Sequence, residues 1–267
     1  MRIRDLFVIL LVLLIGVSCK SEYEALLRSH DTQAKYDAAF QYLDAGKYAK
    51  AVPLFESLKM EVRGTAQDDT VQYYTGLANY RWGDIYVAET CFSSFIKTFP
   101  LSPFFDRANY YHIECLYQQT YRYELDPAPT YKAMSIMEEY LKKNPGSEYK
   151  GEIDDMLVDL NERLDKKAYE AAKVYYHIED YKAAQYAFKN VLKEDASNVY
   201  REDILYYTAM SSYMYALNSV EAKQKERYMT FTDDYFNFIG EFPDSNYRRE
   251  LDVLSRRVNK ILNKNAK

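Results

Sequence analysis

Residues able to carry acid–base, nucleophilic or metal chemistry are few in this chain. The histidines and cysteines are His30, His112, His177, Cys19, Cys91 and Cys115. None stands at a metal-ligand spacing such as His-Glu-x-x-His, and the sequence has neither a glycine-rich phosphate loop nor a Gly-x-Ser-x-Gly turn. The many Asp and Glu residues follow the polar faces of expected helices. We therefore expect no enzymatic activity, no metal and no cofactor.

Tyrosine is the residue type whose number and spacing could create a binding surface. The chain has 29 tyrosines, and two sets recur at fixed positions. The first set is Tyr36, Tyr73, Tyr110, Tyr169 and Tyr206. The second set lies seven residues later and is Leu43, Tyr80, Tyr117, Tyr176 and Tyr213. Both sets share one helical face. Their amphipathic rings would suit either a surface groove or the core between helices.

The elements that position these tyrosines repeat along the sequence. A slot three residues after each first-set tyrosine is mostly filled by small residues, Ala39, Gly76, Ile113, Ala172 and Ala209. A slot in the following helix is filled by Ala51, Ala88, Ala133, Ala184 and Phe231. These registers predict five helix–turn–helix units, stacked so that each buries its apolar face on its neighbours.

The clearest unit runs from Asp69 to Phe104. Gly76 is the small residue of its first helix, Gly83 allows the left-handed turn, Ala88 packs in the second helix, and Pro100 ends it. This order resembles the tetratricopeptide repeat, a helix–turn–helix unit of about 34 residues. A Pro-x-Ser-x-aromatic tail or a variant of it follows four second helices, at residues 100–104, 145–149, 196–200 and 243–247. We expect an all-α, tetratricopeptide-like α-solenoid.

Two insertions and one long helix interrupt the period. Residues 120–130 contain two prolines and predict a loop in unit three, and residues 218–227 are a polar insertion in unit five. Apolar residues at helical spacing predict one long helix from near Glu148 into Tyr176. A capping helix is expected from Tyr247 to Asn263. The expected division is residues 31–146 for units one to three and residues 147–267 for units four and five with the long and capping helices.

Cys91 and Cys115 each lie on an apolar helix face, where a free cysteine packs as a small hydrophobe. They could also meet across adjacent units and form a disulfide in an oxidising compartment. Sequence does not fix the geometry that a disulfide requires, so both states stay open.

The N-terminal residues predict a targeting signal. Arg2 and Arg4 precede an apolar run from Leu6 to Ile15. The run is too short for a comfortable membrane span and suits a secretory signal peptide. Cys19 comes directly after three small residues, which resembles a bacterial lipoprotein signal.

That resemblance implies that residues 1–18 are removed, that Cys19 is lipidated and that residues 19–30 form a tether. Lys20 is not the aspartate that retains lipoproteins in the inner membrane of enteric bacteria, so an outer-membrane location is favoured. The net charge of −5 makes nucleic acid a poor partner, because nucleic-acid binding needs clustered Lys and Arg.

The order of these parts resembles the BamD family of outer-membrane β-barrel assembly lipoproteins over nearly all of residues 20–264. The resemblance implies a lipid-anchored scaffold that faces the periplasm. It implies two kinds of partner: the BamA-like barrel insertase, bound through its periplasmic domains, and unfolded outer-membrane protein precursors. It also implies that the C-terminal repeats, residues 169–263, dock on the insertase.

Two surfaces are therefore candidate sites. The expected precursor-binding groove consists of Tyr36, Tyr73, Tyr80, Tyr110 and Tyr117. The expected docking surface contains Arg248, Arg249, Arg256 and Arg257, since the planar guanidinium pairs well with carboxylates.

Two other functions remain open. One is a repeat lipoprotein that coordinates cell-wall synthesis or envelope protein traffic, although the coiled coil usual in such proteins is absent. The other is a lipoprotein that captures a small ligand. That function needs a closed pocket with convergent polar groups, which an open solenoid groove argues against.

Overall fold

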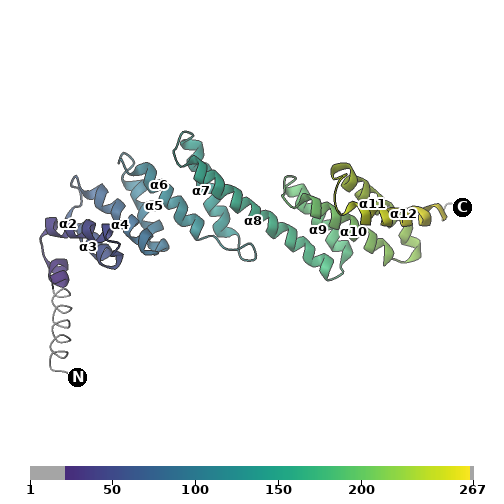
Figure 1. The fold of residues 1–267 in the computed structure, drawn as a ribbon, viewed down its shortest axis with the longest axis horizontal. Helices are drawn as coiled ribbons and strands as arrows, with labels where there is room; N and C mark the ends of the chain where they lie inside the picture. The colour runs from purple at the N-terminus through teal and green to yellow at the C-terminus, as the bar shows by residue number, and fades with distance from the viewer. Residues whose placement is uncertain (1–21, 265–267) are drawn as a thin grey trace, which may run out of the picture. The chain divides into compact units, whose positions relative to one another are not determined.

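The computed structural model describes residues 22–264, and in this part of the chain helices are joined by turns and loops, without strands. A helical stretch at residues 22–28 precedes α2. The first three hairpins are α2 (Thr32–Asp44) with α3 (Tyr48–Glu61), α4 (Asp68–Trp82) with α5 (Ile85–Thr98), and α6 (Phe105–Gln118) with α7 (Ala128–Lys143). The next two hairpins are α8 (Lys150–His177) with α9 (Tyr181–Glu194) and α10 (Arg201–Leu217) with α11 (Glu221–Glu241). The single helix α12 (Arg248–Lys264) follows them. Figure 1 shows consecutive helices lying side by side, as α2 with α3, α4 with α5 and α10 with α11. The predicted all-α repeat fold is confirmed.

The chain divides into two compact parts. The N-terminal subdomain comprises residues up to 120 and 128–154, and the C-terminal subdomain comprises residues 121–127 and those from 155 onward. The long helix expected between units three and four corresponds to α8. Residues 121–127 pack on the C-terminal part of α8, because Lys167 Nζ donates to the carbonyl oxygens of Tyr123 and Leu125 at 3.0 and 2.8 Å. The sequence pattern had grouped this loop with residues 31–146.

The small-residue slot exists because paired helices approach closely there. A Cβ atom added to Gly76 would lie 2.8 Å from Cε1 of Phe92 on α5. Phe92 is itself fully buried, so its ring has little room to give way. Ala39 and Ala209, in the same slot of units one and five, are also fully buried.

In three of the hairpins, the residue at the same turn position has a left-handed backbone conformation. Gly46, Gly83 and Glu179 have φ of 67°, 89° and 63°. In each turn the next amide donates to a carbonyl five residues back, as from Asp84 to Asn79 at 3.0 Å and from Asp180 to Tyr175 at 3.0 Å. These bonds satisfy helix-end carbonyls. Glu179 is the non-glycine member and therefore carries backbone strain.

The recurring tails are capped turns. In each, a Ser or Asn side chain accepts the amide hydrogen of the aromatic residue two positions later. The four bonds are Ser102–Phe104 at 3.2 Å, Ser147–Tyr149 at 3.2 Å, Asn198–Tyr200 at 2.9 Å and Ser245–Tyr247 at 3.0 Å. This bond explains why Ser or Asn recurs, since both side chains bond readily to nearby backbone amides.

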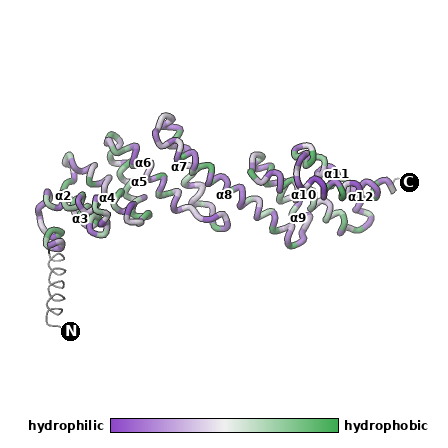
Figure 2. Tube along the Cα trace, in the orientation of Figure 1, coloured by the Kyte–Doolittle hydropathy of each residue, from purple (hydrophilic) through white to green (hydrophobic). Residues whose placement is uncertain are grey.

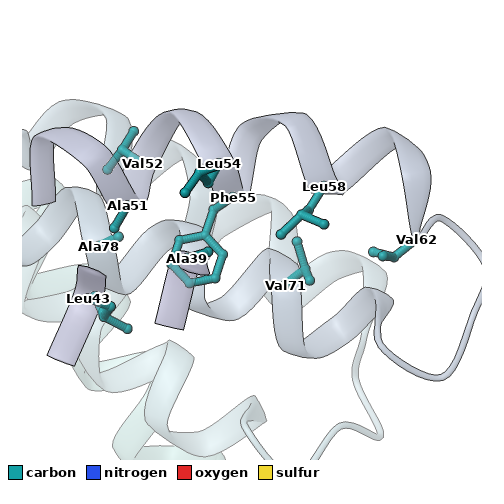
Figure 3. Close-up of a cluster of buried hydrophobic side chains, with 10 residues drawn as sticks. All are labelled: Ala39, Leu43, Ala51, Val52, Leu54, Phe55, Leu58, Val62, Val71 and Ala78. Carbon is teal, nitrogen blue, oxygen red and sulfur yellow. The ribbon is translucent and has the colours of Figure 1, made fainter. Parts of the chain in front are cut away.

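Each subdomain has its own core. Figure 3 shows a cluster in the N-terminal subdomain that includes Ala39 and Leu43 of α2 together with Leu54 and Phe55 of α3. Figure 2 shows apolar and polar residues alternating along the helices, as half-buried helices require.

The C-terminal helix α12 is part of a core. Its Leu251 and Val258 are fully buried, and they belong to one cluster with Tyr206 and Phe238. Its burial explains the apolar stripe that predicted a capping helix.

Both predicted insertions are more regular than expected. Helix α7 starts at Ala128, so Pro129 belongs to its first turn, where proline costs no hydrogen bond. In unit five, α11 begins at Glu221. Most of the polar stretch 218–227 therefore forms the N-terminal turns of that helix, which make it longer.

Candidate functional site

Tyr73 does not line a groove, so that prediction is wrong. Its side chain is 1% exposed. The ring stacks on Phe104, with centroids 4.6 Å apart and planes 10° from parallel, and lies about 6 Å from Phe92 and Phe95. Tyr74 is a fourth aromatic neighbour, at 5.2 Å, so the Tyr73 ring is part of the core.

The other predicted groove tyrosines are half-buried, and the structure joins only some of them. The Tyr80 hydroxyl of α4 donates to Glu114 Oε2 of α6 at 2.8 Å, and Gln118 Nε2 donates to the same hydroxyl at 3.0 Å. Tyr110 and Tyr117 lie four residues before and three after Glu114, on the same helical face. We call Tyr80, Tyr110, Glu114, Tyr117 and Gln118 the tyrosine face. Tyr36 instead packs on Phe40 at 4.7 Å within α2.

The hydroxyls of Tyr80 and Tyr110 stay protonated at neutral pH. Burial raises the pKa of Tyr80 and of Tyr110, and the Glu114 carboxylate raises both further. Tyr110 also stacks on Tyr149 at 4.3 Å, which fixes its ring. The face thus offers ring area, phenol groups and one carboxylate acceptor, the chemistry that holds an extended peptide.

Two of the four α12 arginines are used within the chain. Arg248 Nη1 donates to the carbonyl of Pro243 at 2.6 Å, and its Nε lies 3.7 Å from Asp252 Oδ2. Arg257 Nη1 donates to the Tyr213 hydroxyl at 3.1 Å.

Arg249 and Arg256 are exposed. Across residues 22–264, neither makes a hydrogen bond or ion pair. These two arginines are therefore the members of the predicted docking set that remain available to a partner.

The histidines show no ligand geometry. His112 Nε2 lies 3.2 Å from Glu89 Oε1, and Lys132 Nζ is 3.7 Å from the same oxygen. Burial lowers the pKa of His112. His30 and His177 are exposed. Within the described range no group of three or more His, Cys, Asp or Glu side chains could hold a metal ion.

Cys91 and Cys115 are both free thiols. Burial raises the pKa of both, that of Cys115 to about 12, so neither is an activated nucleophile. The predicted lipidation residue, Cys19, lies outside the described residues.

The sequence did not predict a cavity of about 300 Å³ that lies between α9, α10 and α11. Its cationic lining comes from Lys182, Lys189, Lys223 and Arg227. Each occupies the polar face of its helix, where lysine and arginine ordinarily indicate solvent. The spacing of seven residues within the first pair and four within the second was the available signal.

Repeated helical hairpins define this chain as a tetratricopeptide-type solenoid. Its residues 28–228 match the model of the YfiO family, described as outer membrane lipoprotein. The chain belongs to that family, which confirms the resemblance to BamD-like lipoproteins. No curated protein matches the sequence. No helix among residues 22–264 is both long and apolar enough to cross a membrane.

Two solved structures are similar at low identity. The TPR2AB domain–pHSP90 complex of yeast Sti1 is 10% identical, with a TM-score of 0.40, over 85% of this chain and 98% of that chain. A TPR repeats protein from Bacteroides fragilis NCTC 9343 is 14% identical, with a TM-score of 0.41, over 87% of this chain and 100% of that chain.

Proposed function

We propose that this chain is a scaffold lipoprotein of the outer-membrane β-barrel assembly machinery. It is anchored through lipidated Cys19, faces the periplasm, and binds both a BamA-like barrel insertase and unfolded outer-membrane protein precursors. The family match over residues 28–228 carries this proposal. The tyrosine face and the exposed α12 arginines supply two separate surfaces for its two partners.

The tyrosine face is the proposed precursor site. Unfolded barrel precursors present extended segments with alternating aromatic residues, which can lie across the rings of Tyr80 and Tyr117. The carboxylate of Glu114 can accept a backbone amide hydrogen. Affinity should be modest, because ordering a flexible chain consumes much of the contact energy.

The test replaces two half-buried tyrosines of this face. Because Tyr80 also joins α4 to α6 through Glu114, the melting temperature is measured beside the affinity. Tyr80→Ala/Tyr117→Ala should weaken the binding of a synthetic barrel-terminal peptide by about ten-fold, which corresponds to about 1.4 kcal/mol. Tyr86→Ala/Tyr131→Ala is the matched control, since both residues are exposed on second helices of the same subdomain. Fluorescence anisotropy measures the affinities. Equal losses in the two double variants would contradict the assignment of the face.

Docking on the insertase is proposed for Arg249 and Arg256. Truncation before α12 is a poor test, because it would expose Tyr206 and Phe238, which Leu251 and Val258 cover. Charge reversal at the two exposed arginines leaves that core intact and changes only the surface.

A further inference from the structure

The cavity between α9, α10 and α11 lies wholly within the C-terminal subdomain. Its walls are basic although the chain carries a net charge of −5. Lys182 and Lys189 come from α9, and Lys223 and Arg227 come from α11. Glu226 is the acidic member of the lining. A cationic hollow in an acidic protein indicates a place for an anion.

The floor of the cavity is a fixed polar network. Asp234 is buried, and Lys189 Nζ lies 2.8 Å from its Oδ1. Its Oδ2 accepts from Gln185 Nε2 at 3.2 Å and from the Ser212 hydroxyl. A buried network with its partners in place is rigid, so the walls above it are held in position.

Two of the four cations have no carboxylate partner. Lys189 pairs with Asp234, and Lys223 Nζ lies 3.6 Å from Glu226 Oε2. In the described part of the chain, Lys182 and Arg227 make no ion pair.

Arg227 is nevertheless held in place. Its guanidinium carbon lies 3.9 Å from the centroid of the Tyr215 ring, and its Nη1 donates to the Ser219 hydroxyl. Stacking on an aromatic ring fixes the plane of the guanidinium and leaves its other N–H groups for a ligand.

We propose that this cavity binds a carboxylate side chain from an acidic segment of a partner protein, with Lys182 and Arg227 as the pairing cations. A planar guanidinium matches a carboxylate through two parallel hydrogen bonds. A volume of about 300 Å³ is at the lower limit for ligand pockets and suits one inserted side chain.

One further observation favours a peptide over a lipid phosphate. Tyr186, in the lining, is 60% exposed and offers ring area to the residues that flank the inserted carboxylate. The inference does not depend on which assembly the protein joins.

The test uses the full chain in detergent and a fluorescein-labelled peptide in which Glu alternates with Ser. The same peptide with Gln in place of Glu should bind at least ten-fold more weakly, as loss of roughly 1.4 kcal/mol implies. Lys182→Gln/Arg227→Gln should weaken the binding of the Glu peptide by a similar factor. Arg227→Lys should have an intermediate effect, because lysine keeps the charge but lacks the paired N–H groups of the planar guanidinium.

The matched control is Lys193→Gln/Lys225→Gln, which removes two charges from exposed positions on the same two helices outside the cavity. It should leave peptide affinity unchanged. An equal loss in the control would overturn the proposal in favour of general surface charge. Binding of phosphatidylglycerol vesicles that depends on Lys182 and Arg227, with peptide binding unaffected, would overturn it in favour of a lipid phosphate. If the double variant melts early, Lys182→Gln alone decides, since Lys182 is exposed.

Discussion

The rings of Tyr206 and Tyr247 stack face to face, with centroids 4.1 Å apart and planes 17° from parallel. The Tyr206 hydroxyl donates to Glu250 of α12 at 2.9 Å, and the Tyr247 hydroxyl donates to Asp203 of α10 at 2.7 Å. The same pairing recurs as Tyr73–Phe104, Tyr110–Tyr149 and Tyr169–Tyr200, at 4.6, 4.3 and 4.9 Å. In units two to five, the first-set tyrosine is therefore a joint between the first helix of a unit and the tail after its second helix.

This joint predicts energetic coupling between Tyr206 and Tyr247. In a double-mutant cycle with leucine, the free energies of unfolding should be coupled by about 1 kcal/mol, the usual value for an aromatic pair beyond its area burial. Urea unfolding of the two single variants and the double variant measures the coupling. The exposed pair Tyr131 and Tyr186 should show none. Additive losses at Tyr206 and Tyr247 would mean that the stack contributes only buried area.

The stack also predicts the response to alkaline pH. The hydrogen bond to the Asp203 carboxylate is the larger cause and burial the smaller one, and together they raise the pKa of Tyr247 to about 12. A raised folded-state pKa stabilises the fold fully below the ordinary tyrosine pKa of about 10. That stability is lost as pH rises through the folded value.

Asp203→Asn should therefore reduce the loss of stability that Tyr247 causes between pH 10 and about 12. Urea unfolding across this pH range compares Asp203→Asn with the parent chain and with Tyr247→Phe. If Asp203→Asn keeps the full alkaline slope, the carboxylate is not the cause of the raised pKa.

The repeat register could be predicted because it depends on local periodicity. Gly76 and Ala88 recur in fixed slots since helix approach tolerates only small side chains there. The tyrosine register was equally visible, but its role was not. A tyrosine seven residues from another is on the same face whether that face meets solvent or, as at Tyr73, the tail that follows the second helix.

Glu179 should be a weak point of the backbone. It occupies the left-handed turn position that Gly46 and Gly83 fill in other units, with φ of 63°. A non-glycine residue there costs about 1–2 kcal/mol. Glu179→Gly should therefore raise the free energy of unfolding by about 1 kcal/mol and the melting temperature by about 2–4 °C.

The control for this change is Glu162→Gly, at an exposed position in the middle of α8. Glycine at a helical position should lower stability by about 0.5–1 kcal/mol. Calorimetry on both variants shows whether each substitution raises or lowers the free energy of unfolding. Destabilisation by Glu179→Gly would show that the Glu179 side chain contributes more than its backbone strain costs.

The cationic cavity could not be predicted from the sequence. Lys182, Lys223 and Arg227 lie on polar faces that single-helix patterns assign to solvent. The cations of α9 and those of α11 line one cavity only because α9 packs against α10 and α11. The buried Asp234 below them lies three residues after Phe231 and four before Phe238, on the buried face of α11. That position alone does not show which groups its carboxylate contacts.

Anchoring should depend on Cys19. Its position directly after the apolar run implies lipidation there, so Cys19→Ala should leave an uncleaved or soluble periplasmic form. Membrane fractionation with metabolic labelling by a fatty acid measures this. An alanine variant that still carries lipid and still fractionates with the outer membrane would contradict the lipoprotein signal.

The assembly role is tested most directly by what co-purifies with the full chain from detergent-solubilised outer membrane, identified and quantified by mass spectrometry. We expect an integral β-barrel insertase with the parent chain and with Arg63→Glu/Arg81→Glu, whose two positions are exposed in the N-terminal subdomain. With Arg249→Glu/Arg256→Glu, we expect the insertase to be lost while the melting temperature stays unchanged. Recovery of peptidoglycan synthases without any barrel protein would contradict the assembly role and favour cell-wall coordination.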